Sequence, residues 1–259
     1  MVKIISFANQ KGGVGKTTTA INIAASLAAI KKRVLLVDMD SQGNAGTGLG
    51  FVRAAHKQSV YGALMGNAGV AENILTTAIP NMHLLPASAK LAGAELDMLD
   101  LERREYRLKD ALSTIQDNYD YILIDCPPNL GMLTINALSA SDYVVIPLQC
   151  EFLALEGVAD LIRNINVVKK NFNPKLMLHG VVLTMYDKRN NLTQMVEDDV
   201  RNFFGKKVYD TVIPRNVKIS EAPSHGKPVL LYDFKCSGSQ AYIGLTKEVL
   251  KRERELVAC

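Results

Sequence analysis

The 259-residue chain has only four cysteines, and no two of them are close together in the sequence. Cys126, Cys150, Cys236 and Cys259 form no C-x-x-C pair. Zinc sites, dithiol redox sites and conventional iron–sulfur clusters all need closely spaced thiolates. The sequence therefore argues against these three kinds of site, and we expect reduced thiols that mostly fill the core.

Long uncharged apolar segments are absent as well. None reaches the roughly 18 to 20 residues that a membrane-spanning helix needs. The chain opens with Met1-Val2-Lys3 and continues directly into an apolar run, which leaves no room for a cleavable signal. We therefore expect a soluble protein of the cytoplasm.

Neither positive nor negative charge is in large excess. The chain has 30 Lys and Arg residues and 26 Asp and Glu residues, which gives a net charge of +4. This balance does not by itself imply a nucleic-acid partner. Hydrophobic residues make up 48% of the chain, which is enough for a sizeable core. No Pro/Ser-rich linker or internal repeat divides the sequence, so we expect one domain over residues 1–259.

Short apolar runs alternate with segments of helical periodicity along the chain. Runs without polar interruption are typical of strands buried on both faces, as in a parallel sheet covered by helices. The expected strands are 4–8, 34–37, 82–86, 121–124, 143–147 and 180–184; the expected helices are 17–30, 91–115, 157–172, 192–204 and 240–257. The glycine-bearing segments 43–50 and 62–69 are expected to be loops. The pattern predicts an α/β fold with a doubly wound, mostly parallel sheet flanked by helices, whose ligands bind at the carboxyl ends of the strands.

A glycine-rich segment lies between the first expected strand and the first expected helix. It reads Lys11-Gly12-Gly13-Val14-Gly15-Lys16-Thr17-Thr18. Glycines let successive backbone N–H groups point at phosphate oxygens, and the helix that follows adds the positive end of its dipole. In such a phosphate-binding loop the lysine before the threonines holds the β- and γ-phosphates, and the first threonine hydroxyl ligates Mg²⁺. Lys16 and Thr17 have these positions.

The loop is a variant, because Gln10 stands where the usual G-x-x-x-x-G-K-[ST] pattern has glycine, and a second lysine, Lys11, follows it. A lysine at the start of the loop cannot easily reach the γ-phosphate of its own subunit. Its expected target is a nucleotide bound by another subunit, which predicts an ATP-dependent dimer.

Three aspartates follow expected strands and complete the predicted site. Asp125 ends the run 121–124, and an acidic residue in this place organises Mg²⁺ in P-loop NTPases. Asp38 and Asp40 follow the run 34–37, and two carboxylates so close together would repel phosphate unless metal or water intervened. We expect Asp38 to support the metal with Asp125 and Asp40 to orient or activate the attacking water.

Four stretches together resemble the ParA/MinD family of deviant Walker ATPases, most closely the short, Soj-like chromosome-partitioning ParA proteins. They are residues 11–18, residues 37–44, residues 124–128, and the block from Ile213-Pro214-Arg215-Asn216 to His225-Gly226-Lys227-Pro228. The last block is the most discriminating. One departure is Ser41, where family members commonly have proline. The resemblance runs over essentially the whole chain, and we expect no helix-turn-helix extension before the ATPase segment.

The resemblance implies a function that is switched by ATP and Mg²⁺. Two subunits would sandwich two nucleotides, with each Lys11 on the partner's phosphates, and this homodimer would bind double-stranded DNA without sequence preference. A ParB-type centromere-binding protein would stimulate hydrolysis and release the nucleoid-associated dimer. The family's adenine-side loop maps to Pro214, and its DNA-contacting cations map to Arg189 and Lys218. The roles of Cys126 and His225 are left open.

Other functions on the same scaffold stay open at this point. A MinD-like membrane-cycling ATPase would need a bulky apolar face on the C-terminal helix, whereas residues 250–259 carry a thin apolar face and acidic residues. An iron–sulfur reductase would need paired cysteines, and a GTPase would need an N-K-x-D segment; neither is present. We therefore expect a DNA-partitioning ATPase, with the membrane-cycling ATPase as the alternative.

Overall fold

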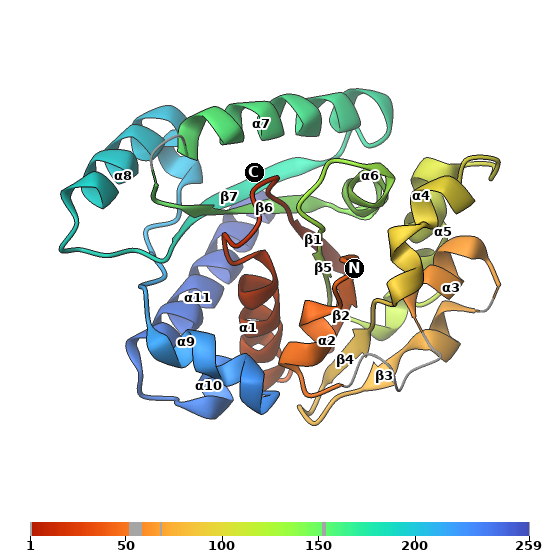
Figure 1. Ribbon diagram of the computed structural model, residues 1–259, viewed down its shortest axis with the longest axis horizontal. Helices are drawn as coiled ribbons and strands as arrows, with labels where there is room; N and C mark the ends of the chain where they lie inside the picture. Colours follow the sequence, from red (N-terminus) through yellow and green to blue (C-terminus); the bar gives the residue numbers. More distant parts are fainter. Residues whose placement is uncertain (1, 52–58, 68, 152–153, 259) are drawn as a thin grey trace.

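A computed structural model describes residues 2–51, 59–67, 69–151 and 154–258. Within these residues seven strands form one sheet in the order β3-β4-β2-β5-β1-β6-β7 (Figure 1). The strands are β1 (Lys3–Phe7), β2 (Val34–Asp38), β3 (Leu75–Thr76), β4 (Met82–Leu85), β5 (Tyr121–Asp125), β6 (Tyr143–Gln149) and β7 (Met177–Thr184). All neighbouring strands are parallel except β3, which runs antiparallel to β4. The predicted doubly wound, mostly parallel sheet is confirmed.

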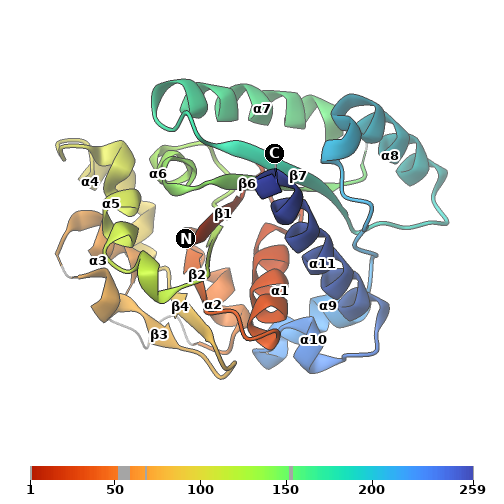
Figure 2. The ribbon, with the colours of Figure 1, turned by 180° about the vertical axis from the view of Figure 1, so that it is seen from behind.

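Helices cover both faces of the sheet, as Figures 1 and 2 show from opposite sides. The helices are α1 (Lys16–Ala29), α2 (Asn44–Gly48), α3 (Val60–Met65), α4 (Ala94–Asp97), α5 (Arg107–Ser113), α6 (Met132–Ala140), α7 (Ala154–Asn171), α8 (Asn191–Phe204), α9 (Val217–Glu221), α10 (Val229–Tyr232) and α11 (Ser237–Ala258). One apolar cluster joins a sheet face to α3, α5, α6, α7 and α8, and a second joins the other face to α1, α2, α10 and α11. Every residue of β2 and β5 is buried, which explains their uninterrupted apolar sequences.

The expected single helix over 91–115 is wrong, because the chain folds there into short helical pieces. Gly93 precedes α4, which ends at Asp97, and α5 begins only at Arg107. Between the two helices Arg103 has φ +53°, a left-handed conformation that interrupts a right-handed helix. Several apolar residues of this segment still belong to one core cluster, which is why their spacing resembled one long helix: Leu91, Ala94, Met98, Leu108, Leu112 and Ile115.

The expected loops over 43–50 and 62–69 are also partly wrong. Residues 44–48 form α2, and α3 extends from residue 60 to residue 65. Helix α2 depends on a tertiary contact, because the Asp38 carboxylate accepts hydrogen bonds from the N–H groups of Ala45 and Gly46, 3.0 and 3.3 Å away. Local propensity does not reveal such a contact.

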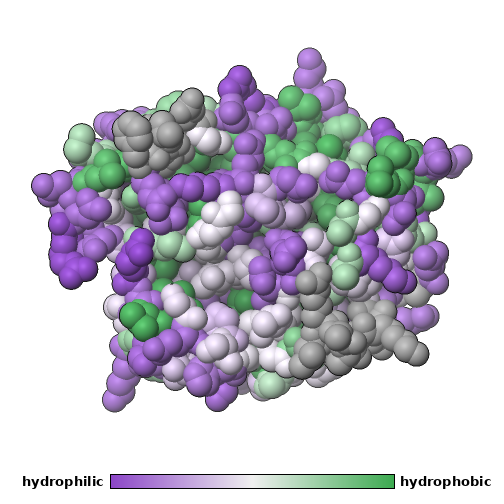
Figure 3. Space-filling model, in the orientation of Figure 1, coloured by the Kyte–Doolittle hydropathy of each residue, from purple (hydrophilic) through white to green (hydrophobic). Residues whose placement is uncertain are grey.

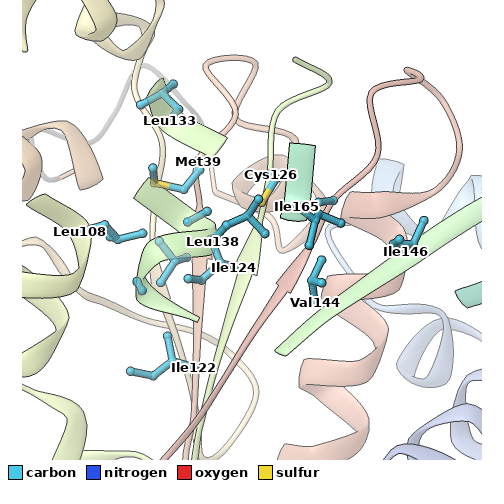
Figure 4. Packing of buried hydrophobic residues seen from close by; sticks show 14 of the residues in the cluster. Met39, Leu108, Ile122, Ile124, Cys126, Leu133, Leu138, Val144, Ile146 and Ile165 are labelled. Carbon is cyan, nitrogen blue, oxygen red and sulfur yellow. The ribbon is translucent and has the colours of Figure 1, made fainter. Parts of the chain in front are cut away.

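The sheet register brings the ends of three central strands together. Asp38 at the end of β2 and Phe7 at the end of β1 both pair with Asp125 at the end of β5. The residues just beyond these ends pack tightly as well, since Met39 and Cys126 lie in one buried cluster with Leu133 of α6 (Figure 4). The carboxyl edge of the sheet therefore places the glycine-rich loop and the strand-end aspartates next to one another.

Candidate nucleotide-binding site

The glycine-rich loop leads from β1 into the 14-residue helix α1. Gly13 and Gly15 have φ of +77° and +87°, a left-handed backbone conformation that residues other than glycine rarely adopt. A Cβ added to Gly12 or Gly13 would meet no atom within 4 Å, so open space lies beside the backbone there. The loop and the N-terminal end of α1 therefore form a cradle suited to an anion.

Lys16 is buried within this cradle, with 7% of its surface exposed. Its Nζ donates a hydrogen bond to the Lys11 carbonyl oxygen, 3.2 Å away. Burial lowers the pKa of the Lys16 ammonium, and the nearby carboxylates of Asp125 and Asp40 oppose that shift. A buried cation held beside an open anion cradle is suited to binding phosphate.

A cavity of about 480 Å³ opens above the cradle. Asp40 and Pro128 line it together with the loop and the start of α1, so the predicted phosphate residues meet around one space: Gly12, Gly13, Gly15, Lys16, Thr17 and Thr18. Val14, the remaining loop residue, is buried and accepts a hydrogen bond at its carbonyl from Thr184. The volume falls within the range of small-molecule sites.

Asp125 is fully buried at the end of β5, and neither carboxylate oxygen has a hydrogen-bond partner in the described part of the chain. Burial raises the pKa of Asp125 well above its ordinary value, and the Asp38 charge raises it further. The Thr17 hydroxyl and the Lys16 ammonium are close enough to oppose the shift, although the threonine does not complete a hydrogen bond with the carboxylate. A buried anion without a partner needs a compensating cation or proton.

These oxygens fit a magnesium ion. Mg²⁺ prefers oxygen ligands and usually takes one or two from the protein, with water and substrate phosphates completing its shell. The described residues contain no group of three or more His, Cys, Asp or Glu side chains that would enclose a metal by themselves. The Thr17 hydroxyl and the Asp125 carboxylate beside a phosphate cradle therefore match the manner in which Mg²⁺ accompanies nucleotides.

The two aspartates after β2 have different environments. Asp38 is fully buried, and its oxygens accept hydrogen bonds from the N–H groups of Asp40, Ala45 and Gly46. Burial raises the pKa of Asp38 to about 7, against the effect of these hydrogen bonds. Asp40 is partly exposed on the phosphate cavity and caps the Gln42 N–H at 2.9 Å. Asp40 is therefore accessible to solvent and ligand. Asp38 instead stabilises the turn after β2 through its hydrogen bonds.

A second cavity of about 310 Å³ adjoins the first and contains Pro214. The two cavities share Gly15, Thr18, Met185 and Pro223 in their walls. Backbone hydrogen bonds from Ile213 to Leu183 and from Tyr186 to Ile213, 2.8 and 2.9 Å long, hold the Pro214 loop against the end of β7. The second cavity therefore adjoins the phosphate cavity and is lined by Pro214, the residue expected on the adenine side of a nucleotide.

Met185 was not singled out from the sequence, yet it lies where the two cavities meet. Its φ of +50° is unusual for a bulky side chain. No sequence signal distinguishes this methionine from any residue that ends a strand.

Lys11 lies apart from the phosphate cavity. Its Nζ pairs with Glu151 Oε2 at 2.5 Å, and 53% of its side chain is exposed. Glu151 also accepts a hydrogen bond from Gln149 at the end of β6. The structure identifies Glu151 as a partner of Lys11 that no sequence motif indicated, and the expected contact of Lys11 with another subunit's nucleotide stays a prediction.

Arg189 and Lys218 are both at the surface and both paired with an acid. Two guanidinium nitrogens of Arg189 donate to Asp187, each at 3.0 Å, although the arginine side chain is 88% exposed. Lys218 pairs with Glu221 at 2.9 Å. Arg189 shares a cavity of about 560 Å³ with Lys188 and Arg215.

Arg215 was not among the predicted contacts. Its guanidinium forms no ion pair with any described residue, so Arg215 and Lys188 are the two cations of that cavity that no such pair neutralises. Its place directly after Pro214 in the discriminating sequence block was the signal that could have found it.

Two expectations about membranes and thiols can also be compared with the structure. Within the described residues no helix is both long and apolar enough to cross a membrane. Cys126 and Cys150 are free and buried, and burial raises the pKa of each thiol to about 12. Cys126 is therefore a neutral packing residue beside the site. Cys236 is free and partly exposed, and Cys259 lies outside the described residues.

Comparison with known proteins decides the family. The family model AAA_31, described as an AAA domain, matches residues 2–178. A chromosome partitioning protein ParA of Caulobacter vibrioides is 56% identical over 98% of this chain and 96% of its own length. The sporulation initiation inhibitor protein Soj of Bacillus subtilis is 55% identical over 96% of this chain and 98% of its own length. The chain belongs to the ParA family of P-loop ATPases.

A solved structure with a similar fold contains a bound nucleotide. A crystal structure described as cobyrinic acid a,c-diamide synthase of Mycobacterium smegmatis, with bound ADP and magnesium, has a TM-score of 0.87 to this chain. It is 38% identical and covers 98% of this chain and 96% of its own. The predicted resemblance, activity and cofactors are confirmed: this ParA-family chain is an ATPase that uses ATP and Mg²⁺.

Proposed function

We propose that this chain is a DNA-partitioning switch, in which ATP assembles a homodimer that binds double-stranded DNA without sequence preference. Hydrolysis, stimulated by a ParB-type centromere-binding partner, would then release the dimer. Relatives that carry chromosome-partitioning names match nearly the full chain, which supports this role. The observation that carries the proposal is the pair of lysines in the loop: Lys16 lines the phosphate cavity, whereas Lys11 is outside its lining and pairs with Glu151.

Each residue of the nucleotide site has a distinct task in this proposal. Lys16 and the loop N–H groups hold the phosphates, and Thr17 and Asp125 would hold Mg²⁺, which when bound offsets the charge of the phosphates. Asp38 fixes the turn through its three backbone hydrogen bonds. Asp40 orients the attacking water, because its carboxylate is the exposed one on the cavity. Pro214 bounds the base side.

Dimerisation would complete the site. Lys11 has to leave Glu151 to reach a partner's nucleotide, and the pair is about half exposed, with 53% and 45% of the two side chains accessible. Exposed pairs typically contribute only about 0–1 kcal/mol, so phosphates of a second subunit can compete for this lysine.

DNA binding would use the cations around the Pro214 loop. Phosphate contacts need charge and reach without base-edge geometry, and Arg189, Arg215, Lys188 and Lys218 supply both. Asp187 and Glu221 would be displaced or bridged, because they now neutralise two of these cations. Two subunits double the set, which predicts steep salt dependence.

The membrane-cycling alternative is disfavoured by the way α11 packs. Its apolar residues Tyr242, Leu245 and Val249 are each at most 1% exposed and lie in the core. The same apolar face cannot lie on lipid without leaving the sheet. This helix is therefore engaged by the fold over most of its length.

The test is binding of the purified protein to a random-sequence DNA duplex without nucleotide and with ADP, ATP or a nonhydrolysable ATP analogue, each at two salt concentrations. We expect binding only with ATP or the analogue, and weaker binding at the higher salt concentration. Arg189→Ala should reduce affinity about tenfold at constant salt. Arg163→Ala is the matched control, because Arg163 is also an exposed arginine paired with an aspartate, on α7. Equal binding in all nucleotide states would contradict the proposal.

A further inference from the structure

Arg189 is held by Asp187 in a short turn after β7. The Arg189 N–H donates to Asp187 Oδ1 at 3.1 Å, and two guanidinium nitrogens donate to the same carboxylate at 3.0 Å each. These hydrogen bonds lower the pKa of Asp187 to about 2, so the carboxylate is charged near neutral pH. Figure 3 shows hydrophilic side chains at the left edge of the molecule, where Figure 1 places the loop from β7 into α8. A cation that the proposed function assigns to DNA is therefore already neutralised within its own chain.

Lys218 is held by Glu221 in a similar way within α9. Its Nζ donates to the Glu221 carboxylate at 2.9 Å and lies 5.6 Å from the centroid of the Tyr232 ring. The Tyr232 hydroxyl donates to the same carboxylate at 3.1 Å. Tyr232 belongs to α10, where His225 stacks on its ring with the two centroids 4.8 Å apart. The tyrosine therefore holds the Glu221 carboxylate beside the lysine, so this pair has support from outside its own helix.

The other cations of the cavity beside Arg189 are unpaired. Lys188 and Arg215 line this cavity of about 560 Å³, and neither forms an ion pair with a residue that the structure describes. These two side chains can contact a phosphate directly, whereas the charge of Arg189 is balanced by its acid. We call Arg189 and Lys218, each paired with an acid of its own chain, the masked cations.

Each masked cation has to leave its acid before it can bind a phosphate. An exposed ion pair typically changes an equilibrium constant by up to about fivefold, and the freed carboxylate then repels the phosphate nearby. In a dimer, contacts made by one subunit hold the duplex close to the other, and this effect strengthens binding by about 10²- to 10⁴-fold. The gain exceeds the cost of breaking the pairs. A single subunit has no such gain, so the masked cations weaken its binding without compensation.

We propose that Asp187 and Glu221 compete with DNA phosphates for Arg189 and Lys218, and that this competition restricts DNA binding to the two-subunit form of the protein. The inference rests on the proposed function, because it takes duplex DNA as the ligand of these cations. The two acids are specificity-determining residues, since they discriminate between one subunit and two on the same duplex.

The first test measures the affinity of Asp187→Asn, Glu221→Gln and the double variant for a random-sequence duplex, with ADP and with a nonhydrolysable ATP analogue. Both substitutions keep the shape of the side chain and remove its charge. With the analogue, each single variant should bind about tenfold more tightly than the unmodified protein, because two pairs in each dimer are weakened. With ADP, the double variant should bind the duplex as one chain, whereas the unmodified protein should stay free.

Salt dependence gives a second readout of the same competition. A cation that leaves its acid for a phosphate frees a carboxylate, which takes up a cation from solution and offsets the counterion released from DNA. Without the acid this offset disappears. The slope of log affinity against log salt concentration should therefore be steeper by about one to two in each single variant with the analogue. Tighter binding with an unchanged slope would contradict the competition.

Two controls separate this competition from a change of net charge. Asp198→Asn removes an exposed acid of α8 that forms no ion pair with a described residue, and it should change the affinity less than about twofold. Asp187→Asn in an Arg189→Ala background should likewise have little effect, because the cation that Asp187 holds is gone. An equal gain in affinity from either control would overturn the proposal.

The remaining outcomes distinguish this inference from the proposed function. Unchanged affinity in both Asp187→Asn and Glu221→Gln, while the unmodified protein binds DNA with the analogue, would overturn the inference and leave the proposed function standing. Weaker binding by both variants would show that the acids hold their loops in place for DNA, which also contradicts competition. Absence of DNA binding by every protein in every nucleotide state would contradict the proposed function and the inference together.

Discussion

At the scale of single residues, three carboxylates at neighbouring strand ends differ in what surrounds them. Asp38 is buried with three backbone donors, Asp125 is buried without a hydrogen-bond partner among the described residues, and Asp40 lines the cavity. The three side chains are chemically the same. Their burial and hydrogen bonds differ, and these differences decide which carboxylate is accessible to a metal ion or to water.

The exposed position of Asp40 leads to a prediction about hydrolysis. Asp40→Ala should bind ATP but hydrolyse it at least a hundredfold more slowly, because the residue that orients water is removed while the phosphate cradle remains. The variant should then stay dimeric and bound to DNA. ATP turnover and DNA retention check this, with Lys16→Ala as the control that loses nucleotide binding. Normal hydrolysis by Asp40→Ala would assign the water-orienting role elsewhere.

A second residue-scale prediction concerns the pair of Lys11 and Glu151. Glu151→Gln removes the charge that holds Lys11 in its own subunit, so the ATP-induced dimer should form at a severalfold lower protein concentration. Stability should change by less than about 1 kcal/mol, because the pair is exposed. Dimer dissociation constants from sedimentation equilibrium provide the measurement. Asp160→Asn, which breaks the Arg163 pair on α7, is the control. A weaker dimer in Glu151→Gln would mean that this pair supports assembly.

The predictable residues were those with a local chemical signature. Gly12, Gly13 and residues 15–18 line the phosphate cavity, as their fixed order of glycines, lysine and threonines predicted. The partners Glu151 of Lys11 and Asp187 of Arg189 were not predictable in the same way. Glu151 is distant in sequence, and an aspartate two residues from an arginine pairs with it only when the turn brings the side chains together.

At the scale of elements, strands were easier to predict than short helices. Uninterrupted apolar runs predicted β2 and β5 correctly, because a strand that is buried on both faces has apolar residues on both. The prediction for segment 91–115 was wrong because Ala94, Leu108 and other apolar residues on both sides of Arg103 are buried in one cluster despite the break there. Helix α2 depends on Asp38, a contact that is absent from its own sequence.

Helix α2 therefore provides an element-scale prediction. Asp38→Ala should lower the free energy of unfolding by about 1–3 kcal/mol, because buried N–H groups at the start of α2 lose their acceptor. Asp38→Asn keeps one side-chain oxygen as an acceptor and should lose less. Urea denaturation of both variants without nucleotide is the measurement. Equal stability of Asp38→Ala and the unmodified protein would show that these hydrogen bonds do not hold α2.

At the scale of the whole molecule, the two faces of the sheet have different neighbours. The face covered by α1 and α11 carries the phosphate cradle, and α11 fixes the far end of β7 as well. There Arg252 donates to the backbone carbonyls of Lys207 and Val208 and lies over the ring of Tyr209. Beneath it His179 is buried and shares a hydrogen bond of 2.6 Å with the Tyr209 hydroxyl.

This buried histidine predicts how global stability depends on pH. Burial, with Arg252 and Lys207 nearby, lowers the pKa of His179 from 6.5 to about 4. The unfolded chain then binds the proton more readily between those values, so stability is fully present above pH 6.5 and falls as the pH drops toward 4. The loss attributable to this group is about 3 kcal/mol.

Unfolding free energies of His179→Gln and the unmodified protein, compared from pH 7.5 to pH 4, measure the effect. As the pH falls, the unfolding free energy of the unmodified protein should decrease more than that of His179→Gln. His83→Gln serves as a control, because His83 is a half-buried histidine that also contacts a tyrosine hydroxyl, that of Tyr119, at 3.0 Å. A constant difference over the whole range would show that His179 does not titrate differently in the folded chain.

The central claim is that ATP converts this chain from a DNA-free form into a DNA-bound dimer. The most direct measurement is sedimentation velocity of the protein with a labelled duplex of about 24 base pairs, in ADP and in a nonhydrolysable ATP analogue. We predict two chains on each duplex with the analogue, free duplex with ADP, and loss of the complex in Lys11→Ala. One chain per duplex in both nucleotide states, unaffected by Lys11→Ala, would contradict the account.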